Sequence, residues 1–448
     1  MAPGTSEEQP SNSLSGALHQ VLANLHQNPY PYVSNPPNCK KRASVALILR
    51  VRPNYHHWPS SSASGVEDRS ASVTEQLDNF FSQSWVQHGD PEALFIKRAS
   101  RVGDRWTGHV ALPGGKRDPE DADDKAAAVR EASEEIGLDL TTNNYICVGN
   151  LPERVVTTSW GSVPLMVLCP FIFLQTSTDS PMLRLQPTEV ASAHWVSLRA
   201  LLSPSLRTME RVDLSERWLT RGGFIARFAC RSMMGFMEFS AIKLVPTESV
   251  HCSSISGFVP EDKSSQTDLS LIERCKSWYL SNQADSSDRS RPLLLWGLTL
   301  GILADFLDML PPHDAVQLWK YPTFTTPDLR LIVTILTYGL RKRNALAAQS
   351  GSLGNQTAVD SQTAALSIAQ DEDIDPKHDP NEVGIGGMGV GRYYGKSAKV
   401  SGDGSSHAVG ILLKGYYDRL RTAILVFLAW RAAAGSLAAF YLWKRLRR

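Results

Sequence analysis

Residues 112–140 read LPGGKRDPEDADDKAAAVREASEEIGLDL, and this stretch is the most informative part of the chain. A Pro-Gly-Gly turn precedes a run of helix-forming residues from about 122 to 136. Because side chains three and four positions apart share one face of a helix, Glu131, Glu134 and Glu135 project together. Like charges at this spacing cost a helix about 0.2–0.5 kcal/mol per pair. A divalent cation would turn this repulsion into a binding site; the alternative is an acidic helix face that meets only solvent.

The three glutamates offer the kind of ligand that magnesium prefers. Mg²⁺ takes oxygen ligands in octahedral geometry and keeps several waters. Such ions bridge phosphate oxygens, neutralise charge in the transition state and activate a water. Gly114 and Gly115 let the backbone approach the helix and a ligand closely, and Arg130 can hold a neighbouring carboxylate in orientation. The pattern therefore predicts a Mg²⁺ or Mn²⁺ site on these carboxylates.

The same stretch resembles the Nudix box, in which an early Gly and Glu precede the sequence Arg-Glu, aliphatic, any residue, Glu-Glu, any residue, Gly, aliphatic. Arg130 and Gly137 stand at their places, as do the three glutamates. The resemblance implies a Nudix fold of the α/β (α+β) class, with a mixed β-sheet sandwiched between helices, insertions and a C-terminal helical tail. It also implies a hydrolase that cuts nucleoside diphosphates linked to another group, with Glu131, Glu134 and Glu135 as catalytic and metal-binding residues.

The early part of the box departs from the family pattern. Lys116 and Ala122 stand where the family has its first Gly and first Glu, whereas Gly115 and Asp121 lie one place earlier. The loop therefore carries one extra residue. Asp121, with Arg130 and Gly137, is expected to support the motif structurally.

The coenzyme A pyrophosphatase branch of the family is similar to this loop, GGKRDPEDADD. Upstream, Arg98, Gly108 and the Pro-Gly-Gly turn match that branch, while Leu112 replaces Phe and Arg105 lies beside the place of an expected Arg. Downstream, residues 187–202 and 293–307 resemble its later segments. The resemblance implies cleavage of coenzyme A to 3′,5′-adenosine diphosphate and 4′-phosphopantetheine. The substrate-binding residues it points to are Arg98, Arg105, Lys116, Gly114 and Gly115.

Several functional alternatives stay open. NADH, ADP-ribose, dinucleoside polyphosphates or capped RNA are other substrates of the class, and an inactive, membrane-tethered Nudix binding module is an alternative of a different kind. The general base is either one of the three glutamates or an acid elsewhere, such as Glu189. The net charge of +1 argues against a broad nucleic-acid surface. The sequence predicts no oligomeric state.

The pattern divides the chain of 448 residues into five parts. Residues 1–41 are expected to be disordered, apart from a short apolar helix at 14–25. Strands and helices with the alternation of an enzyme domain run from 42 to 310, with an insertion at about 203–290 and a helix at 293–310. A helical extension at 311–348 contains a helix from Pro327 to about Ala347. A Gly-, Ser- and Asp-rich disordered linker follows at 349–408.

The last part, residues 409–448, contains an apolar helix at 422–443 and ends KRLRR. Twenty-two helical residues span about 33 Å, enough for a bilayer core. Arg431 lies near the middle and costs about 2.5–3.5 kcal/mol on the insertion scale. A membrane helix is one interpretation, and a helix docked on the enzyme domain or another subunit is the other. The N-terminal acids Glu7 and Glu8 and the scattered cysteines suggest an intracellular protein. Under the membrane interpretation, the C-terminal helix anchors this protein to an organelle membrane with its enzyme domain facing the cytosol.

Overall fold

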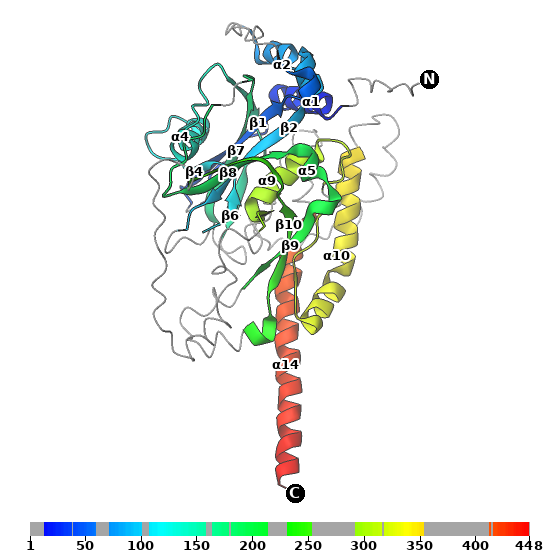
Figure 1. Cartoon of the computed structure of the whole chain (residues 1–448). Helices are drawn as coiled ribbons and strands as arrows, with labels where there is room; N and C mark the ends of the chain where they lie inside the picture. Colours follow the sequence, from blue (N-terminus) through cyan, green and yellow to red (C-terminus); the bar gives the residue numbers. More distant parts are fainter. Residues whose placement is uncertain are drawn as a thin grey trace, which may run out of the picture.

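The computed structural model describes residues 13–37, 39–59, 71–100, 107–157, 164–178, 181–213, 231–252, 292–315, 318–353, 412–413 and 415–447. Of residues 346–353 it describes only the backbone. Arg105 and residues 354–408 of the expected linker lie outside these ranges. Figure 1 shows the whole chain, with the elements labelled in chain order.

The main sheet is mixed, as the family resemblance implies. Within the described residues its nine strands are ordered β11-β8-β2-β1-β7-β5, with β3, β4 and β6 paired to β2, β1 and β7. β1 runs parallel to β7 and antiparallel to β2. The strands are β1 Arg42–Arg52, β2 Asp90–Arg98, β3 Val110–Ala111, β4 Gly114–Lys116, β5 Tyr145–Asn150, β6 Arg154–Thr157, β7 Pro164–Gln175, β8 Val190–Ser197 and β11 Pro246–His251.

β1 is central because its sequence, RASVALILRVR, is apolar on both faces. Successive strand residues point to opposite sides, so Leu47 and Leu49 enter one core while Ala46 and Ile48 enter the other. α4 (Asp124–Ile136) covers the second core through Ala128, Ala132 and Ile136. The sheet is therefore enclosed on both faces.

The first core is covered by helices and by a second, smaller sheet (Figure 1). The helices are α1 Leu14–Gln27, α2 Val73–Ser82, α3 Ser84–Gln87, α5 Leu198–Leu202 and α9 Gly297–Asp308. The second sheet consists of β9 Arg207–Val212, β10 Met237–Lys243, β12 Leu294–Trp296 and β13 Thr323–Phe324. The fold class is thus confirmed, with more β-structure than the sequence pattern indicates.

One expectation is confirmed and two need correction. The short helix expected at 14–25 is present as α1, and its Leu18, Leu22 and Leu25 are buried in the first core, so this part of residues 1–41 belongs to the fold. The helix expected at 293–310 begins only at Gly297, since the preceding residues pair with β10 as β12. The expected insertion supplies β9, β10 and β11 to the fold, and its remainder, 214–230 and 253–290, lies outside the described residues.

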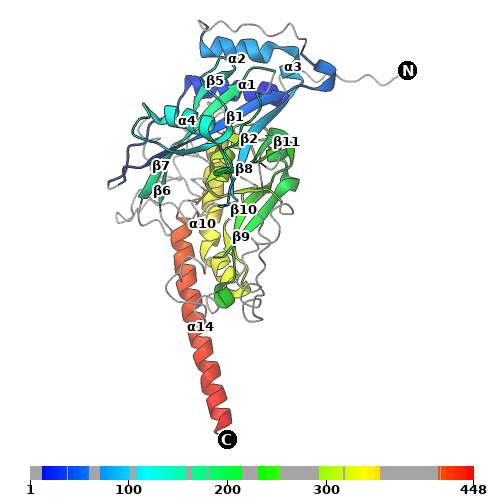
Figure 2. The ribbon, with the colours of Figure 1, turned by 60° about the vertical axis from the view of Figure 1, so that its left-hand side comes forward.

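Two long helices lie at the C-terminal side of the chain. α10 (Pro327–Leu353) confirms the helix expected there and runs six residues beyond its expected end into the segment expected to be linker. α14 (Tyr416–Leu446) begins beside α10, and its second half projects away from the rest of the molecule (Figure 1, Figure 2). Asn344 Nδ2 donates to Leu412 O across 3.0 Å, whereas Asp328 pairs with Arg431, so the two helices run antiparallel.

Candidate active site

The start and end of α4 are fixed by local interactions. Asp123 is the N-cap, and its carboxylate accepts a hydrogen bond of 2.7 Å from the backbone N–H of Ala126. Gly137 ends the helix in the left-handed region, at φ +73°. A Cβ on Gly137 would lie 2.7 Å from Cβ of Arg184, so only glycine fits this end. These contacts orient the acidic side of the helix toward the Pro-Gly-Gly turn.

Glu135 is the most buried of the three glutamates, with 2 % of its surface exposed. Its carboxylate accepts a hydrogen bond of 2.9 Å from the backbone N–H of Gly114. Burial raises the pKa of Glu135 to about 7, since desolvation disfavours the charged form. Glu131 and Glu189 raise this pKa further, and the Gly114 N–H and Arg98 oppose the rise.

Glu131 lies against Gly115 on the same side of the helix. A Cβ on Gly115 would come within 2.5 Å of the Glu131 carboxylate, so the glycine makes room for that group. Burial raises the pKa of Glu131, and Arg130, 3.1 Å away, opposes the rise. The raised pKa values show that the charged forms of Glu131 and Glu135 are both disfavoured. A divalent cation would compensate both the desolvation of these carboxylates and their mutual repulsion.

Arg130 holds the outer part of this acidic face. It contacts Asp121 through Nε at 3.0 Å and through Nη2 at 3.1 Å. Its Nη1 donates to Glu134 across 2.9 Å. The Arg130 guanidinium holds the pKa of Asp121 below its usual range. Asp121 thus meets Arg130 although it lies one place early in the box, and Glu134 is the most exposed of the three glutamates.

The other acids of the loop are engaged in structural contacts. The backbone N–H of Asp118 donates to Asp121, and Asp123 caps the helix. Asp124 pairs with Arg42 at 2.8 Å and with Arg117 at 3.3 Å. The Asp118 carboxylate lies 3.7 Å from Arg130, so each acid of this loop other than the exposed Glu120 helps to hold α4.

A second group of metal-binding residue types lies beneath the start of α4: ligand atoms of Asp124, Glu153 and Cys169 lie within 4.8 Å of one another. The guanidinium of Arg42 occupies this position. Its five N–H donors reach Asp124, Glu153, Cys169, the carbonyl of Val33 and the side chain of Asn35. Five is the full donor complement of Arg, so the cluster is a buried ion-pair network. An isolated Arg at the start of a strand gave no sequence signal for it.

The other residues predicted for the site are Arg98, Glu189, Lys116 and Arg105, and the structure describes the first three. The charge of Arg98 lowers the pKa of Glu135, and the charge of Glu189 raises it. The ends of their strands are joined by the backbone N–H of Ala99, which donates to Glu189 O across 2.8 Å. The side chain of Lys116 is exposed, while its carbonyl accepts a hydrogen bond from Arg130. Arg105 lies outside the described residues.

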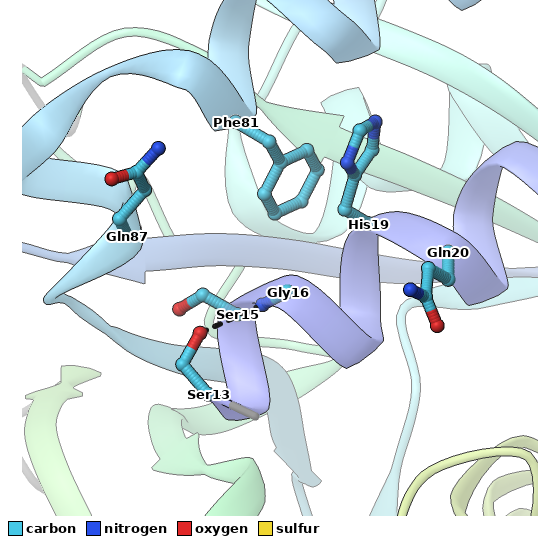
Figure 3. A pocket seen from close by; sticks show the side chains of 7 residues that line it. All are labelled: Ser13, Ser15, Gly16, His19, Gln20, Phe81 and Gln87. Carbon is cyan, nitrogen blue, oxygen red and sulfur yellow. Dashed lines mark hydrogen bonds between the residues drawn. The ribbon is translucent and has the colours of Figure 1, made fainter. Parts of the chain in front are cut away.

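Two cavities lie apart from the catalytic acids. One, of about 200 Å³, lies between α1 and α2, where His19 stacks on Phe81 and Ser13 caps the helix (Figure 3). None of its lining residues carries a carboxylate. The other, of about 260 Å³, lies beside Leu138, Trp195 and Glu248. Neither contains a predicted site residue.

Comparison with known proteins agrees with this geometry. Residues 85–216 match the family model of the NUDIX domain. The chain belongs to the Nudix hydrolase superfamily. Members of this superfamily act on nucleotide conjugates and generally use divalent metals. The resemblance to the coenzyme A pyrophosphatase branch is also supported by relatives.

Three proteins with similar sequences show how far the resemblance extends along the chain. Uncharacterized protein C14C4.10c of Schizosaccharomyces pombe is 33% identical over 309 residues, 68% of this chain and 77% of that protein. Peroxisomal coenzyme A diphosphatase NUDT7 of Mus musculus is 53% identical over 45 residues, 10% of this chain and 19% of that protein. Mitochondrial coenzyme A diphosphatase NUDT8 of Mus musculus is 46% identical over 52 residues, 12% of this chain and 25% of that protein. The matches to the two diphosphatases therefore cover a quarter or less of their length.

Proposed function

We propose that this Nudix hydrolase is a Mg²⁺- or Mn²⁺-dependent pyrophosphohydrolase that cleaves the diphosphate of coenzyme A or its derivatives. The products are 3′,5′-adenosine diphosphate and 4′-phosphopantetheine. The observation that carries the proposal is the loop GGKRDPEDADD, which is similar to the coenzyme A branch and whose acids secure the catalytic helix. The short matches to two coenzyme A diphosphatases support the same substrate.

In this proposal the two inner carboxylates, Glu131 and Glu135, hold the principal metal ion. A bound Mg²⁺ neutralises charge on the diphosphate and lowers the pKa of a coordinated water. Glu134 binds a further ion or orients the attacking water, and Arg130 keeps its carboxylate in place. Glu189, close to both inner carboxylates, is the alternative general base.

Binding of the negatively charged diphosphate requires positively charged side chains and backbone groups that can approach its oxygens. Arg98, whose charge lowers the pKa of Glu135, is proposed to contact a phosphate oxygen of the substrate. Lys116, exposed after the glycine turn, and Arg105 are proposed as further phosphate contacts. Gly114 and Gly115 let β1 and the Glu131 carboxylate approach the turn closely, and their backbone is proposed to contact the diphosphate.

Product identification tests the substrate. The purified chain is incubated with Mg²⁺ and coenzyme A, NADH, ADP-ribose, a dinucleoside polyphosphate or capped RNA, and products are separated by mass. We expect coenzyme A to be turned over with the highest kcat/KM and to yield the two phosphorylated products named above. Preference for another conjugate would replace the substrate, and binding without turnover would indicate the inactive binding module.

We further propose that α14 attaches the enzyme to an organelle membrane inside the cell, with the catalytic domain facing the cytosol. Among the described residues α14 alone is long and apolar enough to cross a bilayer. Only 17% of its apolar stretch is buried inside the molecule. Extraction of membranes with alkaline carbonate tests this attachment, since release into the supernatant would contradict a spanning helix.

A further inference from the structure

α14 consists of two parts with different surroundings. Its first part packs against α10 through residues that are buried: Tyr416, Tyr417, Leu420, Ala423, Ile424 and Phe427. The second part, beyond Arg431, is exposed and projects from the domain (Figure 1, Figure 2). Docking on the enzyme and exposure of a free apolar helix, which the sequence offered as alternatives, therefore occur in the same helix.

The exposed apolar surface of α14 begins at Leu425, before the last docked residue, Phe427. On the side of α14 turned away from α10, Leu425 and Leu428 are 67% and 40% exposed. From Leu425 to Trp443 the helix rises about 27 Å, close to the roughly 30 Å of a bilayer core. Only Arg431 interrupts this apolar surface with a charge.

Arg431 has a partner on the other helix. Its Nε lies 2.8 Å from Oδ2 of Asp328, in the first turn of α10. The two side chains are 41% and 30% exposed, so in water the pair contributes little to stability. In hydrocarbon a lone guanidinium is strongly unfavourable, and charged groups there are found paired.

α10 adds apolar surface next to this pair. Leu331 and Ile335 are 61% and 65% exposed and lie one turn apart on the same face of the helix. Because α10 and α14 run antiparallel with Asp328 beside Arg431, these residues flank the docked part of α14. The basic residues Arg341, Lys342 and Arg343 then follow at the end of this stretch.

We propose that α10 and α14 contact the bilayer together, and that Asp328 neutralises Arg431 so that the apolar surface from Leu425 to Trp443 can enter the membrane. This inference rests on the proposed membrane attachment and assigns it a second helix and a specific ion pair. α10 dips its first turns, with Leu331 and Ile335, into the near side of the bilayer.

The occupant of this surface is a lipid bilayer because the free half of α14 is apolar all round. Its large exposed residues fall on every side of a helix at 100° per residue: Leu437, Phe440, Tyr441, Leu442, Trp443 and Leu446. A helix docked on a second protein would keep one polar side for solvent. The aromatic residues directly precede Lys444 and Arg445, the order found where a membrane helix meets the headgroups.

The test compares the full-length protein with Asp328→Asn and Asp418→Asn, after reconstitution into vesicles of phosphatidylcholine and phosphatidylserine. Asn at 328 keeps a side-chain oxygen that can accept from the backbone N–H of Leu329, as Asp328 does across 3.1 Å, but removes the charge. Asp418 is the matched control, since it pairs with Arg421 at 3.8 Å, outside the exposed apolar surface. We expect Asp328→Asn to lower the ratio of carbonate-resistant to released protein roughly tenfold, and Asp418→Asn to leave it unchanged. The double variant Asp328→Leu/Arg431→Leu regains resistance.

The outcomes separate the two proposals. Release of the wild type by carbonate would overturn both the membrane attachment and the ion-pair inference. Retention of the wild type and of Asp328→Asn to the same extent would overturn the inference alone. Nucleotide hydrolysis in detergent, unchanged in all these variants, establishes that each is folded and keeps the hydrolase proposal independent of the result.

Discussion

The backbone N–H of Gly114 donates to the Glu135 carboxylate across 2.9 Å, which ties the turn before α4 to the last turn of that helix. Gly114 has φ +150°, and a Cβ there would lie 2.2 Å from the carbonyl oxygen of Ser44. Glycine is thus required both by backbone conformation and by the approach to β1. The turn and the helix form one rigid unit, in which Glu135 is held before any ion binds.

Replacing Glu135 by Gln removes the charge and retains the shape of the side chain. We expect kcat with Mg²⁺ to fall by about 10²–10⁴-fold. Because burial disfavours the Glu135 carboxylate, the metal-free variant should resist urea better than the metal-free wild type at alkaline pH. Kinetics and urea unfolding in a chelator measure the two effects.

Glu134→Gln is the matched control for this substitution. Glu134 is exposed and paired with Arg130, so its loss should leave metal-free stability unchanged within about 1 kcal/mol. Normal turnover by Glu135→Gln with every cleaved substrate would refute the role of this carboxylate.

Gly115→Ala tests the position of Glu131. The added Cβ would come within 2.5 Å of the carboxylate at the end of a flexible side chain, which can move aside. We therefore expect a small effect on folding but at least a roughly tenfold loss of Mg²⁺ affinity, as for other disturbed metal-ligand environments. Calorimetric titration with Mg²⁺ measures it. Gly339→Ala, with nothing within 4 Å of the added Cβ, should bind the ion as the wild type does.

Arg42→Met tests the network beneath the start of α4. It leaves the carboxylates of Asp124 and Glu153, which are 8% and 6% exposed, without their shared cation. We expect a loss of about 3–5 kcal/mol in the free energy of unfolding. Arg199→Met, which removes an ion pair with a 75%-exposed Arg, should cost less than about 1 kcal/mol. Equal losses in urea unfolding would show that burial does not determine the strength of these pairs.

The catalytic helix could be predicted because its signals are local. Asp123 before the first turn, Gly137 after the last one and the spacing of the three glutamates all act over a few residues. The mixed sheet followed from the resemblance together with apolar runs such as β1. These features need no knowledge of what packs against them.

The features that were missed depend on contacts between distant parts of the chain. Arg42 meets Glu153 because β7 pairs with β1 on one side and with β6, which Glu153 directly precedes, on the other, and no spacing in the sequence indicates that meeting. The strand β11 joins the main sheet at β8 although its residues are largely polar and exposed, so its hydrophobic pattern is weak. Docking of α14 depends in the same way on α10, with which it shares the Asp328–Arg431 pair.

His194 gives a pH-dependent prediction outside the catalytic centre. Both ring nitrogens are hydrogen-bonded at 2.8 Å, to Oγ of Ser192 and of Ser249. Burial lowers the pKa of His194 from 6.5 to about 4, and His251 and Lys97 act in the same direction. Because the folded protein binds the proton less readily than the unfolded chain, this residue's contribution to stability is complete above pH 6.5 and is lost as the pH falls toward 4.

We measure the free energy of unfolding in urea at about pH 7.5 and about pH 5. Between these pH values we expect it to fall by about 2 kcal/mol more in the wild type than in His194→Gln. Gln stays neutral over this range and can still bond to both hydroxyls, so its own effect at the higher pH should be small. His88→Gln, at an exposed position, should show the pH dependence of the wild type. If His194→Gln lost as much stability as the wild type on acidification, protonation of the buried ring would not be the cause, and the loss would have to come from carboxylates that gain protons on unfolding.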